Sequence, residues 1–112
     1  GAIMNEETKI QNTIQVHLNK IGITFRANVG TFRTKTGGRV STGLPNGFPD
    51  LFGFRKSDGR IFFIEVKTNK GKLSKNQIKM RDMLLKHPVI YGVARSPEQA
   101  IAIVEEKETL HE

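Results

Sequence analysis

Apolar residues recur at helical spacing near the N-terminus and predict an amphipathic helix over residues 5–20. The members of this repeat are Ile10, Ile14, Leu18 and Ile21. Asn5 can cap the first turn, because its side-chain oxygen can accept from a backbone N–H that has no partner within the helix. Gly22 follows the repeat and predicts the C-terminal stop, since glycine readily adopts the left-handed conformation that often ends a helix.

Two further helices are predicted from the residues that would cap them. Ser74 and Gln77 have the spacing of a capping box, in which each side chain bonds the other residue's backbone, and predict a helix to about Lys86. Ser96 followed by Pro97 predicts another helix start, because serine is a good N-cap and proline fits the first helical position.

Four apolar segments have the length and composition of β-strands. They cover residues 23–27, 50–54, 61–67 and 89–94. The third, Ile-Phe-Phe-Ile-Glu-Val-Lys, begins as a nearly continuous apolar run, which is typical of a central strand covered on both faces. Asp58-Gly59 predicts a hairpin between the second and third strands. The last strand follows a helix, so we expect it to lie parallel to its neighbour.

A glycine-rich segment interrupts this pattern between residues 28 and 47, where five glycines occur. It predicts a long loop with a hairpin near Thr36-Gly37-Gly38, and long loops in compact domains are usually functional or mobile. The expected fold is therefore α/β, a mixed β-sheet flanked by helices in the order α-β-β-β-α-β-α, in a single domain over residues 1–112.

The charge of the chain indicates a class of binding partner. The net charge is +7, and it is unevenly distributed. Lys and Arg outnumber Asp and Glu by six to three in residues 1–50 and by ten to three in residues 51–86, but are outnumbered two to five in residues 87–112. A charge that serves only solubility needs no such clustering. Positive potential in the middle of the chain favours a polyanion, most simply nucleic acid.

Composition also excludes several classes. No apolar run approaches the roughly eighteen residues that a membrane helix needs, so we expect no membrane span. The chain has no cysteine, which excludes a disulfide scaffold and a thiolate zinc site. We expect an intracellular, cytoplasmic protein.

The candidate chemistry lies at the ends of two predicted strands. Asp50 begins one strand, and Glu65 and Lys67 end the next, with fourteen residues between the two acids. Glu65 and Lys67 share a face because strand side chains alternate. In an antiparallel hairpin both acids and the lysine can converge, and two close carboxylates repel unless a cation lies between them. Carboxylate and carbonyl oxygens suit Mg²⁺ or Mn²⁺, which can polarise a phosphoryl oxygen and activate a water.

Each part of this constellation also has an ordinary structural interpretation. A Glu-x-Lys pair at a strand end is commonly a surface pair, and Asp50 after Pro49 is commonly a turn residue. The combination, at a hairpin-compatible separation in a basic region, favours a metal-dependent phosphodiester hydrolase. Seven cations are candidate nucleic-acid contacts, with a solvated surface as the alternative. They are Arg26, Arg33, Lys35, Arg39, Lys70, Lys72 and Lys75.

Pro49-Asp50 followed by Glu65-Val66-Lys67 resembles the signature of the PD-(D/E)xK nuclease superfamily, and the finer resemblance is to its VRR-NUC family. The resemblance spans roughly residues 6–94. It implies a restriction-endonuclease-like core and a metal held by the two carboxylates and the backbone carbonyl of Val66, with Lys67 catalytic. It adds Glu7 as a ligand from the first helix, with Glu6 as the alternative, and Gln77 as an active-site residue, a role that competes with helix capping.

The resemblance also implies a function. Small members of this superfamily are similar to Holliday junction resolvases, so we expect a Mg²⁺- or Mn²⁺-dependent endonuclease that acts on DNA, branched DNA included, as a homodimer. The family name implies a viral or phage origin. Two alternatives stay open: a basic nucleic-acid-binding module that keeps the fold without the chemistry, and an RNA substrate, which one tyrosine and no tryptophan disfavour.

Overall fold

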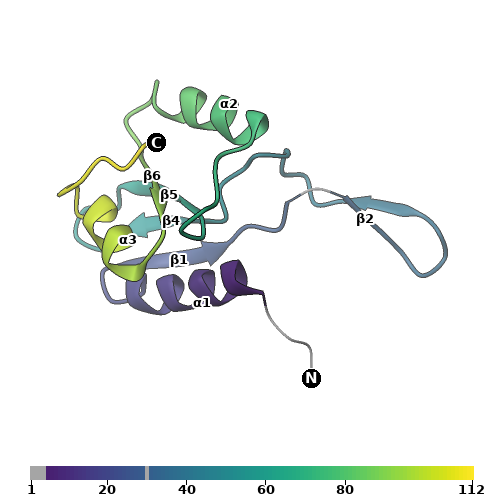
Figure 1. Cartoon of the computed structure of the whole chain (residues 1–112), viewed down its shortest axis with the longest axis horizontal. Coiled ribbons are helices and arrows are strands. Elements are labelled where there is room, and N and C mark those ends of the chain that lie inside the picture. The colour runs from purple at the N-terminus through teal and green to yellow at the C-terminus, as the bar shows by residue number, and fades with distance from the viewer. Residues whose placement is uncertain (1–4, 30) are drawn as a thin grey trace.

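The computed structural model describes residues 5–29 and 31–112. Three helices and six strands follow one another in these residues (Figure 1). In chain order they are α1 (Glu6–Leu18), β1 (Gly22–Arg26), β2 (Thr31–Arg33), β3 (Arg39–Ser41), β4 (Leu51–Arg55), β5 (Ile61–Val66), α2 (Lys75–Leu84), β6 (Ile90–Ala94) and α3 (Pro97–Val104). The predicted α/β class is confirmed, and the observed order contains two short strands, β2 and β3, that the prediction left within a loop.

The main sheet has the strand order β1-β4-β5-β6. The pairs β1·β4 and β4·β5 are antiparallel, whereas β5·β6 is parallel, as expected for a strand reached through a helix. The predicted hairpin at Asp58-Gly59 joins β4 to β5, and Gly59 adopts the positive φ of 75° that this turn requires. The predicted central strand, β5, therefore lies between two neighbours.

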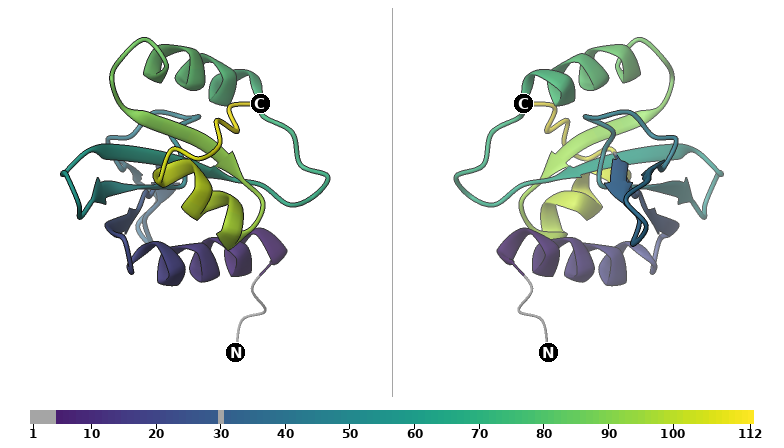
Figure 2. Two further views of the ribbon diagram at one scale, coloured as in Figure 1. Left: turned by 90° about the vertical axis from the view of Figure 1, so that its left-hand side faces the viewer. Right: turned by 90° about the vertical axis from the view of Figure 1, so that its right-hand side faces the viewer.

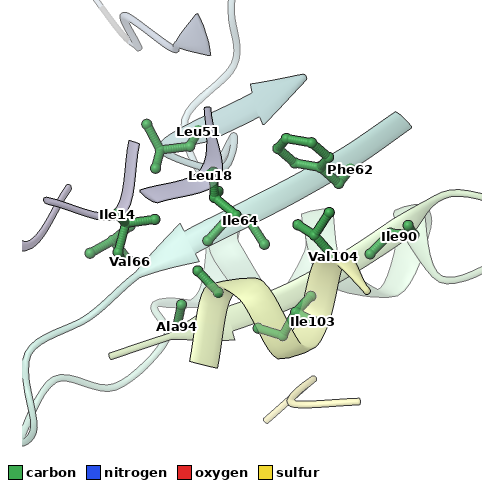
Figure 3. Close-up of a cluster of buried hydrophobic side chains, with 11 residues drawn as sticks. Ile14, Leu18, Leu51, Phe62, Ile64, Val66, Ile90, Ala94, Ile103 and Val104 are labelled. Atoms are coloured by element: carbon green, nitrogen blue, oxygen red, sulfur yellow. The ribbon is translucent and has the colours of Figure 1, made fainter. Parts of the chain in front are cut away.

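Helices cover both faces of this sheet, with α1 and α3 on one face and α2 on the other (Figure 2). Along β5, Ile64 and Val66 point into the larger core, where they pack with residues of α1 and α3 (Figure 3). Phe63 belongs to a smaller apolar cluster that includes Leu84 of α2. Because strand side chains alternate, Glu65 must lie on the α2 face, between the residues that anchor β5 in the larger core.

The three predicted N-caps are confirmed. Asn5 Oδ1 accepts from the Thr8 N–H at 2.7 Å, and Ser96 Oγ accepts from the Gln99 N–H at 3.2 Å. The hydroxyl of Ser74 accepts from the backbone of the third helical residue at 3.2 Å, completing the predicted capping box. No helix in the described part of the chain is long and apolar enough to cross a membrane.

The predicted stop at Gly22 is wrong. Helix α1 ends at Leu18, and Asn19 in right-handed conformation is its C-cap. Gly22 instead begins β1, where the chain passes very close to the neighbouring strands. A Cβ atom there would lie 2.8 Å from the carbonyl oxygen of Phe54 and 2.9 Å from the ring of Phe62. Glycine is needed for close packing of strands rather than for a left-handed turn.

The predicted hairpin within residues 28–47 is formed by β2 and β3, which pair antiparallel in a sheet of their own. This ribbon, which we call the arm (residues 31–41), projects away from the rest of the domain (Figure 1). The arm adds no residue to either apolar cluster in the described part of the chain.

Candidate active site

The register of β4 and β5 brings Asp50 and Glu65 together. Leu51 pairs with Ile64, so the next pair toward the open end of the hairpin is Asp50 and Glu65. Both side chains lie on the α2 face. Asp50 is held in place by its Oδ2 atom, which accepts from the Val66 N–H at 2.8 Å, and by its carbonyl, which accepts from the Ala27 N–H at 2.9 Å. The predicted convergence of the two carboxyl groups is thus present in the structure.

Glu65 is almost completely buried, with 1% of its surface exposed. Burial, followed by the hydrogen bond and the charge of Asp50, raises the pKa of Glu65 to about 10, against the opposing effect of Lys67. Within the described residues, Oε2 of Glu65 is buried without a hydrogen-bond partner. A buried carboxylate oxygen without a partner is costly in a purely structural role, so this atom calls for a functional explanation.

Lys67 is the third member of the predicted constellation. Its side chain is also buried, and it follows β5 by one residue on the face that carries Glu65. The charge of Lys67 acts to lower the pKa of Glu65, which places the ammonium group near the carboxyl pair. The order of acid, acid and lysine along one sheet edge is the arrangement that the sequence predicts.

The Asp50 and Glu65 carboxyl groups supply the type of oxygen ligand that Mg²⁺ and Mn²⁺ prefer. Oε2 of Glu65 has no hydrogen-bond partner among the described residues, and Asp50 is hydrogen-bonded to the same carboxyl group, so a cation bound at Oε2 would face both acids. Among residues 5–29 and 31–112, no three His, Cys, Asp or Glu side chains form a group that could hold a metal ion. The negative charge of Glu7 contributes to the raised pKa of Glu65, and the Glu7 side chain is half-buried, whereas Glu6 is exposed. Glu7 is therefore the better placed of the two predicted ligands from α1.

The turn before Asp50 is shaped by Gly47. Its φ is +91°, and a Cβ atom there would lie 2.4 Å from the carbonyl oxygen of Asn76 in the first turn of α2. The turn therefore packs directly on the helix start that carries Gln77. In this structure Oε1 of Gln77 accepts from the Ser74 N–H at 2.8 Å, which is the capping role; a role for Gln77 in the reaction stays a prediction.

The seven candidate nucleic-acid contacts lie in four places. Arg26 follows Phe25 on the outer strand, where its guanidinium donates to Oε1 of Gln11 at 2.7 and 3.2 Å. Lys70 and Lys72 are exposed on the loop after β5. The other four are Arg33, Lys35 and Arg39 on the arm and Lys75 at the start of α2. In the described residues none of the seven forms an ion pair with a carboxylate.

The arm has an unusual charge arrangement. Arg33 and Arg39 lie directly opposite each other in the register of β2 and β3, and residues 8–49 contain no Asp or Glu. Like charges directly opposite one another destabilise a β-ribbon, and an isolated two-stranded ribbon is only marginally stable in water. An external polyanion would relieve this repulsion.

Two arginines near the site were missed by sequence reasoning. Arg95 follows β6, and the parallel register that pairs Val66 with Ala94 places Arg95 beside Lys67. Arg81 lies on α2, which covers the same face. The spacing of Arg95 from Lys67 carries no signal along the chain. The sequence predicted a parallel neighbour for the last strand but named neither that neighbour, β5, nor the register.

Comparison with known proteins agrees with this geometry. A family model described as "VRR-NUC domain" matches residues 5–98. A solved structure titled "VRR_NUC domain" matches with a TM-score of 0.65 and 20% sequence identity, covering 94% of this chain and all of the other. At that identity the likeness establishes the fold. Among curated protein sequences, none matches the chain significantly.

Proposed function

Since the chain belongs to the VRR-NUC domain family, a family of nucleases, we propose that it is a Mg²⁺- or Mn²⁺-dependent nuclease that hydrolyses DNA phosphodiester bonds. The observation that carries this proposal is the pairing of Asp50 with a buried Glu65 whose Oε2 atom has no hydrogen-bond partner in the described chain. Lys67 lies beside this pair. A carboxyl group so buried and unsatisfied is better explained by a cation than by packing.

In the proposed mechanism, Asp50, Glu65 and the carbonyl oxygen of Val66 would hold the cation, and Glu7, which does not group with the two acids in this structure, would join them only after its side chain moves. The bound cation supplies Lewis acidity at the phosphate. Lys67 can donate a hydrogen bond to the attacking water or to the charge that develops on the phosphoryl oxygens. Its burial helps, because an ammonium group in a low dielectric interacts more strongly with a developing anion than one in bulk water.

DNA binding is supported by the distribution of unpaired cations. The arm presents three exposed cations in a segment without acids, and the loop after β5 adds Lys70 and Lys72 near the catalytic edge. Contacts of this kind address the phosphate backbone rather than base sequence, so we propose recognition of DNA structure, including branched DNA, by a homodimer that presents two sites.

The experiment is substitution of the paired acids. We expect Asp50→Asn and Glu65→Gln each to abolish cleavage of a fluorescent four-way junction and a linear duplex, because each removes a ligand charge. Binding in EDTA should stay near normal. Glu108→Gln, at an exposed acid far along the C-terminal segment, is the matched control and should cleave like the unmodified chain. EDTA should stop cleavage, and added Mg²⁺ or Mn²⁺ should restore it.

Three outcomes would change the proposal. Cleavage that survives both substitutions would remove the assigned catalytic roles. Salt-dependent binding without any metal-dependent cleavage would identify a binding module that keeps only the fold. Equal cleavage of duplex and junction at one salt concentration would leave the nuclease assignment intact but contradict the preference for branched DNA.

A further inference from the structure

A cavity of about 680 Å³ lies beside the catalytic edge, on the α2 face of the sheet. Its walls come from the loop after β5, from α2, from the end of β6 and from the C-terminal segment. The lining residues used below are Lys70, Lys72, Leu73, Arg81, Arg95 and Glu112. Four of these are cations and one is an acid, so the cavity has a strong excess of positive charge.

Arg95 connects this cavity to the reaction centre. It is next to Lys67 in the parallel register, because the preceding pair is Val66 with Ala94 and the Lys67 N–H donates to the Ala94 carbonyl at 3.1 Å. Nη1 of Arg95 also donates to the carbonyl of Thr68. The guanidinium is therefore fixed at the carboxyl ends of two parallel strands, the edge at which α/β sheets bind their ligands.

The cavity already holds an anion that belongs to the chain. Nη2 of Arg95 donates to the side-chain carboxylate of Glu112, and Arg81 donates to the backbone carbonyl of the same residue. The C-terminal segment reaches this position beside α2 (Figure 2), and the Val93 N–H donates to the Leu110 carbonyl at 2.6 Å on the way. The two guanidinium groups therefore converge on oxygens of one residue, Arg95 on its side-chain carboxylate and Arg81 on its backbone carbonyl, and such a pair of donors also suits the oxygens of a phosphate.

We propose that Arg81 and Arg95 form a second phosphate site, which binds a backbone phosphate of the nucleic-acid strand next to the one being cleaved, and that Glu112 is an intramolecular competitor for it. The proposal rests on the proposed function for the identity of the strand, but the site itself is a binding site and can be tested without cleavage. Lys70 and Lys72 extend the same positive wall toward solvent. Leu73 adds an apolar side chain to the lining, against which a sugar or base can pack.

The test is a salt titration of binding to a fluorescein-labelled 20-base-pair duplex in EDTA, where no cleavage occurs. Arg81→Gln should weaken binding about tenfold and reduce the slope of log affinity against log salt by about 0.9, because one phosphate contact is lost. Glu112→Gln should have the opposite effect and tighten binding about threefold, since the competitor for the site has lost its charge.

The chain provides a matched control pair. Glu106 also contacts two arginines, Arg55 and Arg60, both through Oε1 of its carboxylate, near the turn at the far end of β5. Arg60→Gln should change the slope by much less than 0.9, and Glu106→Gln should not tighten binding. Equal slopes for Arg81→Gln and Arg60→Gln would overturn the proposal. The proposal would also be overturned if Glu112→Gln melted at a lower temperature without binding DNA more tightly, because the cluster would then only anchor the C-terminal segment.

Inorganic phosphate separates two sources of the same anion. Melting temperatures are measured with added phosphate at constant ionic strength. The assignment to nucleic acid would be overturned, and a site for free phosphate identified, if phosphate raised the melting temperature of the unmodified chain but not of Arg81→Gln while both proteins had the same salt slope of DNA binding. Failure of the nuclease proposal looks different. The chain would then bind DNA in an Arg81-dependent way but would not cleave it with any metal.

Discussion

Gly47 links the turn that carries Asp50 to the start of α2, and Gly47→Ala tests whether this contact positions the site. The φ of +91° costs an alanine about 1–2 kcal/mol. The new Cβ would also lie 2.4 Å from the carbonyl oxygen of Asn76, where ordinary contacts are 3.4–4 Å, and making room in a packed region costs about a further 1–3 kcal/mol. Together we expect a loss of about 2–5 kcal/mol in the free energy of unfolding.

Gly59→Ala is the control for the backbone contribution. Gly59 has a similar φ of +75° in the β4–β5 turn, but a Cβ there would meet no atom within 4 Å, so only the conformational cost of about 1–2 kcal/mol applies. Urea denaturation measures both variants. Cleavage should also fall for Gly47→Ala, on the order of 10²-fold for a 1 Å displacement of Asp50, and should hold for Gly59→Ala. Equal losses of stability in the two variants would refute the steric reasoning.

Three further predictions concern the metal, the arm and the core. In EDTA, protonated Glu65 favours the folded state fully below its ordinary pKa of 4.5, and this contribution to stability is lost as pH rises through about 10. Thermal melts of the unmodified chain should therefore show a melting temperature that declines over this pH range. The decline should be smaller in Glu65→Gln and with Mn²⁺ present. Arg33→Gln and Arg39→Gln should each reduce the salt slope of duplex binding by about 0.9 while leaving the melting temperature unchanged or higher, because like charges across the ribbon are removed. Gly92→Ala should destabilise the domain, because its Cβ would lie 2.5 Å from the side chain of Ile103, and Ile103→Val should restore part of the loss in a urea titration of the double variant.

The local features of this protein could be predicted from its sequence because each depends on neighbouring residues. The capping box at Ser74 and Gln77 is decided within one helical turn, and the hairpin at Asp58-Gly59 within four residues. The pairing of Asp50 with Glu65 follows from that hairpin, since a tight turn sets the register of both strands. The most informative part of the site was therefore accessible from local rules.

The features that were missed depend on residues far apart in the chain. Gly22 matches a helix stop in sequence, but its conformation is decided by the approach of Phe54 and Phe62 from two other strands. The helix–strand order gives a parallel pair without giving its register, so the position of Arg95 beside Lys67 could not be read along the chain. The length and direction of the arm are equally undetermined, because glycine-rich segments have no apolar pattern that fixes their place in the fold.

The alternation of side chains along β5 explains how one strand can serve both stability and chemistry. Ile64 and Val66 are fully buried in the larger core between α1 and α3, and they hold the backbone of the strand in place. The residues between and after them, Glu65 and Lys67, are thereby fixed on the opposite face without relying on the weak interactions of a loop. This arrangement removes Glu65 from water, which lowers the stability of the fold in the absence of a cation. The same desolvation strengthens every electrostatic interaction at the site once a cation and a phosphate are bound. The same placement that makes the buried carboxyl pair costly is therefore what we expect to make it effective.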